Sequence, residues 1–340
     1  MTTSGSVTSI AKTIRDFSDR MTAGMPKKVK KHFREYLLGM TIPPEIRRKS
    51  ISNISSLVSV YHQSTLNRAI HAVDSDILEG NYVTYLRKIV GNHKVQFIGD
   101  DTLLEHPGSR VMENVGWFFD HASGNNVLAH QYVTTMLHDL DADEFYPFLV
   151  RLYVKENNKN NKNEKEEGIN NAGNERNFRT KLQIMDDLFT IASKNFNVAG
   201  KTADSWYSSY KFLGDHYITE MKSNRKASLV NMGKITNRNR DLFYTMDEIL
   251  ETTFLMHERD SDSGMLEDFP LYVLVKAWLS NGDPVNLVIL YNPENGRKKF
   301  LASDCVEGDD LIRAWNDRWP IETFHNDAKD LGLGEYRQWL

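Results

Sequence analysis

Three carboxylates in this sequence stand where they could hold divalent cations together. Asp100 ends the apolar segment of "VQFIGDDT", Asp204 ends a shorter segment in "TADSWYSS", and Glu322 lies in a late helical stretch. A strand fixes its backbone, so a carboxylate at its end can point into the crevice at the sheet edge. Hard oxygen ligands of this kind suit Mg²⁺ or Mn²⁺. A lone strand-terminal aspartate is more often a turn former or a helix cap, so the interpretation depends on all three acids.

The late stretch "WNDRWPIETFHNDAKDLGL" brings large aromatic, basic and acidic side chains together. Pro320 suits the first turn of a helix and disfavours α-conformation at Trp319, so a final helix is predicted to begin there. Arg318 then lies just before this helix, and Trp315 lies on the preceding one.

Helical and strand-like segments alternate around the acids. Residues 1–90 have helical apolar spacing, interrupted at "TIPPE", and residues 178–194 have it again. Short turns, "NGDP" and "NPENG", separate the last strand-like runs and favour antiparallel pairing. Runs typical of strands cover residues 94–98, 127–137, 145–154, 272–279, 285–291 and 298–303.

Composition limits the function classes. The 340 residues are 40% hydrophobic, which is enough for one large core or two smaller ones. The single cysteine, Cys305, rules out an intramolecular disulfide, and a cytoplasmic location is expected. No secretory signal and no apolar run of about 20 residues is present, so we expect no membrane insertion.

Positive charge is concentrated near the start of the chain. Residues 1–50 hold eleven Lys and Arg against four Asp and Glu, although the whole chain has a net charge of -4. The segment "PKKVKKHFREYLLGM" reads as a helix with one apolar side, and it could be a solvated face or a nucleic-acid contact surface. A second basic cluster favours nucleic acid, namely Arg47, Arg48 and Lys49. The candidate contacts in the first cluster are Lys27, Lys28, Lys30 and Lys31.

The late stretch gives the pattern W-x2-R-x3-E-x6-K, which resembles the Y-x2-R-x3-E-x6-K signature of the DDE transposases of prokaryotic insertion sequences. "RWPIETFHNDAK" is similar to the R-W-x-I-E-x-F-H stretch of that family, and "DDT" is similar to its D-x-T at the first acid. "TADSWYSS" followed by "YITEMKSNRKA" resembles the region of the second acid and the basic strand after it. The motifs lie within residues 30–340.

The resemblance implies a ribonuclease-H-like catalytic domain that cuts and rejoins double-stranded DNA at transposon ends, with a homodimer pairing two ends. The expected fold is α/β, with a mixed sheet, flanking helices, a helical N-terminal domain and an inserted β-rich subdomain. The expected divisions are a basic, DNA-binding helical domain at 1–90, a first core part at 91–227 with a disordered insertion at 156–175, a β-rich subdomain at 228–305 and closing helices at 306–340.

The resemblance also assigns Asp100, Asp204 and Glu322 as catalytic metal ligands for two Mg²⁺ or Mn²⁺ ions. Two metals about 4 Å apart can bridge a phosphodiester, one activating the attacking oxygen and the other stabilising the leaving oxygen. The D-x-T spacing selects Asp100. Asp101 stays open as the first ligand, because neighbouring residues of a strand point to opposite faces.

Several basic and aromatic residues are expected to contact DNA. Glu322 and Lys329 share a helical face two turns long, so Lys329 and Arg318 could reach phosphates beside the metals, with Trp315 packed on a sugar or base. The alternative makes Arg318 and Glu322 a surface ion pair and Trp315 a core residue. Phosphate contacts are also expected from the turn after the second-acid region, at Lys222, Asn224 and Arg225.

Two hypotheses follow. The first is an active, metal-dependent transposase, and the second is an inactive relic that binds DNA without cutting it. Trp315 lacks the phenolic hydroxyl of the family tyrosine, and the sequence stops at "GEYRQWL" where relatives continue, which favours a truncated or decayed element. The presence of all three acids favours the enzyme.

Overall fold

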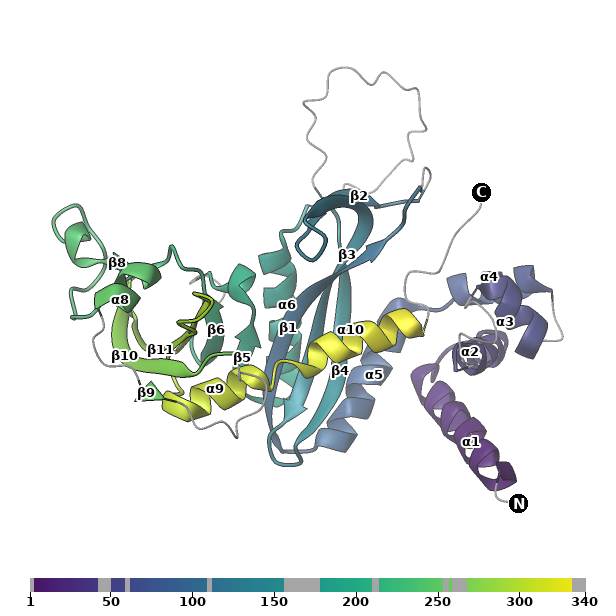
Figure 1. The fold of residues 1–340 in the computed structure, drawn as a ribbon. Helices are drawn as coiled ribbons and strands as arrows, with labels where there is room; N and C mark the ends of the chain where they lie inside the picture. The colour runs from purple at the N-terminus through teal and green to yellow at the C-terminus, as the bar shows by residue number, and fades with distance from the viewer. Residues whose placement is uncertain are drawn as a thin grey trace.

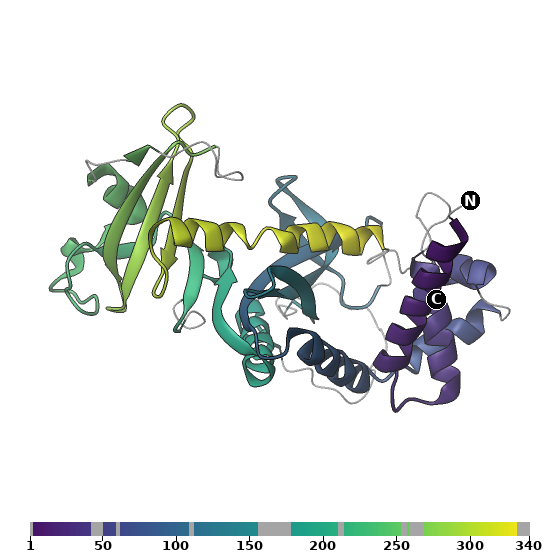
Figure 2. The same ribbon diagram turned by 90° about the horizontal axis from the view of Figure 1, so that it is seen from below.

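The computed structural model describes residues 3–41, 50–58, 62–108, 112–155, 178–209, 214–252, 257–258 and 268–331. A group of helices at the N-terminus leads into one extended mixed sheet (Figure 1). Two consecutive C-terminal helices run along this sheet from its β-rich half to the strands of the first half of the chain (Figure 2). The predicted α/β class is confirmed. None of the described helices combines the length and the apolarity that a bilayer crossing needs.

The described part of residues 1–90 is helical, as predicted. The helices are α1 (Thr3–Met21), α2 (Lys27–Met40), α3 (Ile51–Val58), α4 (Gln63–His71) and α5 (Ser75–Val90). The first four pack on one another, whereas α5 contacts both α1 and the sheet. Its Tyr85 ring lies 5.7 Å from the Phe17 ring, and its Tyr82 hydroxyl donates to the Pro147 carbonyl at 2.5 Å. Helix α5 therefore connects the N-terminal helices to the sheet.

The sheet has the order β2-β3-β1-β5-β6-β12-β11-β10-β7-β8, with β4 paired to β3 and β9 paired to β10. Strands β1, β5 and β6 are parallel, and β3 runs antiparallel to both β1 and β4. The first strands are β1 (Lys94–Glu105), β2 (Gly116–Asp120), β3 (Asn125–Asp139), β4 (Glu144–Tyr153), β5 (Asn197–Ala203) and β6 (Tyr217–Met221). The others are β7 (Lys226–Ser228), β8 (Tyr244–Thr245), β9 (His257–Glu258), β10 (Leu271–Leu279), β11 (Pro284–Tyr291) and β12 (Lys298–Ser303).

Helices cover both faces of the sheet. The other described helices are α6 (Lys181–Asn195), α8 (Met246–Thr252), α9 (Gly308–Asn316), α10 (Pro320–Asp330) and the short 3-10 helices η1 (Ser205–Tyr207) and η2 (Arg240–Leu242). Helices α5, α6 and α8 pack on one face, where fully buried Phe97 and Met185 belong to the largest apolar cluster. On the other face, Leu311 of α9 and Ile321 of α10 are fully buried in two smaller clusters.

The predicted strands in the second half of the chain are present. Strands β10, β11 and β12 pair antiparallel, as their short turns indicated. Strand β12 also pairs antiparallel with β6, and β7 pairs with β10. The β-rich segment therefore continues the sheet that contains β1, β5 and β6.

Three features differ from the predictions or lie beyond them. Strand β2, an edge strand, was not predicted. The residue before Pro320 was predicted to leave the helical region, but Trp319 has φ -55° and ψ -35°. Hydrogen bonds explain this, because the Trp319 N–H donates to the Asn316 carbonyl and the Glu322 N–H donates to the Trp319 carbonyl, both at 2.9 Å, which makes the α9–α10 junction a helical turn. The expected insertion at 156–175 and the second basic cluster lie outside the described residues.

A glycine in β5 gives a test of this packing. A Cβ at Gly200 would lie 2.8 Å from the His216 carbonyl oxygen and 3.2 Å from Gln96 Oε1. We expect Gly200→Ala to lower the free energy of unfolding by about 1–3 kcal/mol, because it forces β5 away from its neighbours. Urea unfolding measures this change.

The matched control is Gly80→Ala in α5, where an added Cβ meets no atom of the described residues within 4 Å. Alanine is a better helix former than glycine, so this variant should be unchanged or up to about 1 kcal/mol more stable. Equal effects of the two substitutions would contradict the packing described for β5.

Candidate active site

Alternation along β1 separates the two neighbouring aspartates. Asp100 meets Arg318, which lies just before α10, whereas Asp101 meets Lys181, the first residue of α6. These helices cover opposite faces of the sheet. The geometry thus brings Asp100, rather than Asp101, to the helix that carries Glu322.

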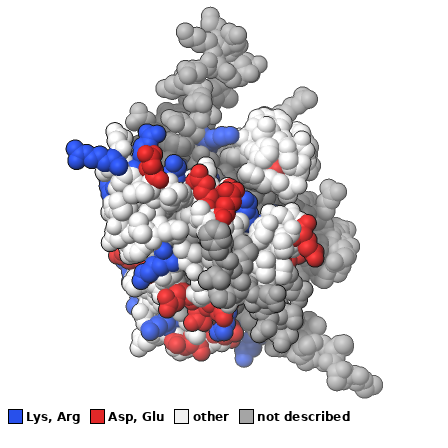
Figure 3. All heavy atoms as spheres, turned by 60° about the vertical axis from the view of Figure 1, so that its left-hand side comes forward, with Lys and Arg blue, Asp and Glu red and all other residues white. Residues whose placement is uncertain are grey.

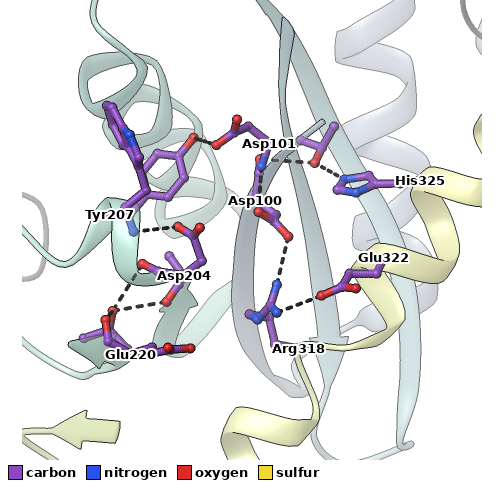
Figure 4. A network of polar contacts seen from close by, with 12 residues as sticks. Asp100, Asp101, Asp204, Tyr207, Glu220, Arg318, Glu322 and His325 are labelled. Atoms are coloured by element: carbon purple, nitrogen blue, oxygen red, sulfur yellow. Dashed lines mark hydrogen bonds and ion pairs between the residues drawn. The ribbon is translucent and has the colours of Figure 1, made fainter. Parts of the chain in front are cut away.

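Arg318 joins the first and third carboxylates. Its Nη1 donates to Asp100 Oδ2 at 2.8 Å, and its Nη2 donates to Glu322 Oε1 at 2.9 Å (Figure 4). The side chains of Arg318 and Asp100 are 12% and 14% exposed, so this pair is largely withdrawn from water, while Glu322 is 36% exposed. The expected approach of Asp100 and Glu322 from distant segments is thus observed. The alternative of a simple surface ion pair between Arg318 and Glu322 leaves out the bond from Arg318 to Asp100.

Asp204 follows β5 directly and caps η1. Its Oδ1 accepts a hydrogen bond from the Trp206 N–H at 3.0 Å. Gly99 of β1 pairs with Ala203 of β5 in a parallel register, so Asp100 and Asp204 each follow a paired residue. Figure 4 shows the Asp204 side chain in the space between β5 and β1, facing Asp100.

These carboxylates repel one another. Burial raises the pKa of Asp100 to about 7, the Arg318 guanidinium opposes the rise, and the Asp204 and Asp101 charges add to it. Burial likewise raises the pKa of Asp204, and Asp101 contributes. A divalent cation would favour the ionised forms, and the donors are the carboxylate oxygens that Mg²⁺ and Mn²⁺ prefer. The chemistry of Asp100, Asp204 and Glu322 therefore fits such an ion.

A tighter group of possible metal ligands lies elsewhere among the described residues. Ligand atoms of His93, Asp139 and Asp141 all lie within 4.8 Å of one another, at the start of β1 and the end of β3. The Asp139 carboxylate there accepts the Asp141 and Ala142 N–H groups at 3.0 Å and contacts His93 Nδ1 at 2.9 Å. These contacts account for the closeness of the three residues, because Asp139 accepts two backbone N–H groups of the turn and pairs with His93.

Helix α10 also contacts the sheet through a buried histidine. His325 Nε2 lies 2.6 Å from Thr134 Oγ1, and the Thr134 hydroxyl donates to the Asp100 carbonyl at 3.2 Å. A neutral imidazole has one N–H group and one acceptor nitrogen, so the tautomer of His325 sets which partner donates in its bond with Thr134. Burial lowers the pKa of His325 to about 4, and nearby Lys329 contributes. A neutral imidazole therefore connects α10 to the strands beside Asp100.

A fourth acid, Glu220, was not identified from the sequence. Ala203 pairs with Thr219 in parallel register, so Glu220 of β6 lies next to Asp204 in the row of acids. It forms an ion pair with Lys299 of β12 at 3.2 Å. Ile218 of the same strand packs in the cluster under α9, so the two-residue period of a strand places Glu220 on this face, and no sequence pattern gave that orientation.

Trp315 is a core residue, which corrects its expected stacking on DNA. It is 5% exposed and belongs to the apolar cluster under α9. The Lys299 ammonium lies 5.5 Å and the Arg318 guanidinium carbon 5.0 Å from its ring centroid. The alternative of a packing role for Trp315 is the one that this geometry supports.

Apart from Arg318, described above, the other predicted DNA contacts lie at the surface with two half-buried exceptions. Lys329 is exposed in the last turn of α10, and Lys222 and Asn224 are exposed in the turn after β6. Arg225 is half-buried and donates to the Ser208 carbonyl at 3.1 Å. Of the predicted lysines of α2, Lys30 is half-buried, and the exposed ones are Lys27, Lys28 and Lys31. The face in Figure 3 carries interspersed acidic and basic side chains rather than one basic patch.

Comparison with known proteins gives one family. A family model described as "Archaeal putative transposase ISC1217", of the DDE transposase type, matches residues 3–338. No curated protein matches the chain.

The buried imidazole predicts a pH dependence of stability. In the folded protein the pKa of His325 is lowered to about 4 from an ordinary 6.5. The contribution of the neutral imidazole to the free energy of unfolding is therefore complete above pH 6.5 and is lost as the pH falls toward 4. Glutamine does not titrate at this position. When the pH falls from 7.5 to 4.5, the free energy of unfolding of His325→Gln should therefore fall by about 2.5 kcal/mol less than that of the wild type. Urea unfolding with a chelator measures this, and parallel pH profiles would contradict it.

Proposed function

Because the chain belongs to the family of DDE-type insertion-sequence transposases, we propose that it cuts and joins DNA at the ends of a mobile element. The observation that carries this proposal is the placement of Asp100, Asp204 and Glu322 on one face of the sheet, with Arg318 bound to the first and third acids. Metal-dependent phosphodiester hydrolysis and strand transfer are the reactions that such a set of carboxylates supports.

The strand arrangement supports a ribonuclease-H-like core. Strands β4, β3, β1, β5 and β6 form a continuous part of the sheet, in which β1, β5 and β6 are parallel and β3 is antiparallel to β1. The first acid lies on the central strand of this set, the second follows its parallel neighbour, and the third lies on a covering helix. We propose the domain division 1–90, 91–227, 228–305 and 306–340 on this basis.

Two Mg²⁺ or Mn²⁺ ions are the proposed cofactors, held by Asp100, Asp204 and Glu322. When bound, such ions activate the attacking water or 3′-hydroxyl and stabilise the leaving oxygen. The chain's own residues fix the ligands. Arg318 orients Asp100 and Glu322, and the η1 turn orients Asp204 through the Trp206 N–H.

Double-stranded DNA, at transposon ends and target, is the proposed partner, bound by a homodimer that pairs two ends. Lys329 extends from the same helix as Glu322, so it can reach a phosphate close to the acids. The Arg318 guanidinium is a second phosphate-binding candidate, although it is held by carboxylates here. The turn after β6 and the basic side of α2 complete the proposed contacts.

The first test is cleavage. With Mg²⁺ or Mn²⁺, the protein should cut DNA carrying the ends of its own element. Substitution of any one acid by alanine should reduce the cleavage rate by about a thousandfold or more, because each removes a ligand worth several kcal/mol of charge stabilisation. The variants are Asp100→Ala, Asp204→Ala and Glu322→Ala, assayed by gel for strand cleavage and joining.

End binding, measured in parallel in a chelator, should change little in these three variants. An unmodified protein that binds the ends but never cuts them would favour the relic hypothesis. If the protein neither binds nor cuts authentic ends, both hypotheses are wrong.

The second test concerns phosphate contact. Lys329→Ala should weaken end binding and lower the slope of log K against log salt by about one unit, since one phosphate contact is lost. The control is Lys194→Ala, which removes an exposed charge from the last turn of α6. Salt titrations of binding separate the two variants, and an unchanged slope for Lys329→Ala would exclude a direct phosphate contact.

A further inference from the structure

Asp101, which points to the face of β1 opposite Asp100, has a full set of partners. Lys181 Nζ lies 3.2 Å from both of its carboxylate oxygens. The Tyr207 hydroxyl donates to Oδ1 at 3.2 Å, and Gln131 Nε2 donates to Oδ2. A carboxylate has about four acceptor sites, and these contacts use them. Asp101 is therefore committed to the chain itself and is a poor candidate for a metal ligand.

Two of the partners of Asp101, Lys181 and Tyr207, connect it to the turn that follows Asp204. Tyr207 and Trp206 belong to η1, which begins directly after Asp204. The Tyr207 N–H donates to the Asp204 carbonyl at 3.1 Å, and the Trp206 N–H donates to its carboxylate at 3.0 Å. The Lys181 ammonium lies 3.9 Å from the Trp206 ring centroid. Figure 4 shows Tyr207 reaching from this turn to Asp101.

We propose that Asp101, Lys181 and Tyr207 form a positioning network that fixes η1 and thereby orients the Asp204 carboxylate for metal binding. This inference rests on the proposed function, because it assigns a task to residues around a proposed ligand. None of the three touches the reacting atoms. They act through the backbone N–H that Asp204 accepts.

Burial makes the network rigid. Tyr207 is fully buried, and the side chains of Lys181 and Asp101 are 10% and 16% exposed. Burial and the neighbouring acids raise the pKa of Tyr207 well above its ordinary value, so its hydroxyl stays a proton donor. The network also joins three separate segments, namely β1, the start of α6 and η1. Supporting residues of this kind typically change metal affinity or activity by 10–100-fold when they are replaced.

Lys181 has a second effect, which is electrostatic. Asp101 adds to the negative potential at both Asp100 and Asp204. The Lys181 ammonium neutralises Asp101 across the sheet from these acids. Without Lys181, the Asp101 carboxylate would have an unpaired charge and could attract a cation away from the productive position.

The experiment measures Mn²⁺ binding to the full-length protein by electron paramagnetic resonance of the free ion, and the Mn²⁺ dependence of end cleavage. Binding that the wild type shows and Asp100→Ala loses defines the signal of the proposed site. Tyr207→Phe and Lys181→Met should each weaken this binding, and raise the Mn²⁺ concentration for half-maximal cleavage, by about tenfold. End binding in a chelator should not change.

Tyr217→Phe is the matched control. Tyr217 is 3% exposed, and its buried hydroxyl has no hydrogen-bond partner among the described residues, so this variant removes a buried hydroxyl without breaking a described contact. If Tyr207→Phe and Lys181→Met lower the melting temperature but bind Mn²⁺ within twofold of the wild type and the control, the network is only structural and the inference is wrong. If the wild type itself shows no Mn²⁺ signal that depends on Asp100, the proposed function fails, and the inference fails with it.

Discussion

The Arg318 guanidinium binds the Asp100 carboxylate, which lies 218 residues earlier in the sequence. It therefore holds two distant parts of the chain together. It fixes the start of α10 against the central strand, and with it the position of Glu322. A guanidinium is suited to this task because it is planar, always charged and able to donate to two carboxylates at once. Its guanidinium carbon also lies 5.0 Å from the centroid of the buried Trp315 ring, at the distance of a cation–π contact. The helix, the strand and the acids are arranged around this one side chain.

The pleat of β1 gives the two neighbouring aspartates different tasks. Asp100 joins the face covered by α10, and Asp101 joins the face covered by α6, so adjacent residues serve the proposed metal site and the scaffold behind it. The same parallel register places Asp204 beside Asp100 and Glu220 beside Asp204. The row of acids thus follows from strand pairing, whereas its neutralisation depends on side chains from other elements, Arg318 and Lys299 among them.

The sequence predicted the elements that have a strong local signal. Pro320 marked the start of the last helix, and the turn residues before Val285 and after Tyr291 marked an antiparallel group, because proline and turn chemistry act within a few residues. It could not predict contacts that depend on tertiary packing. Trp319 stayed helical before proline because the hydrogen bonds of the α9–α10 junction outweighed the preference of a residue before proline. The D-x-T spacing selected Asp100 only through the family resemblance, and the partners of the two aspartates, Arg318 and Lys181, required the knowledge of which helix covers which face.

The pairing of β12 with β6 has a mechanical consequence. Backbone pairing of Phe300 with Met221 through Ser303 with Ile218 connects the β-rich half to the strand beside Asp204. Two lobes joined by a flexible linker could hinge freely, but here a hinge would have to break a ladder of hydrogen bonds in the middle of a sheet. A force applied to the β-rich half by a bound macromolecule would therefore be transmitted as a twist of the sheet. The strand that carries Glu220 would turn with it, and the spacing of the acids would respond to that torsion.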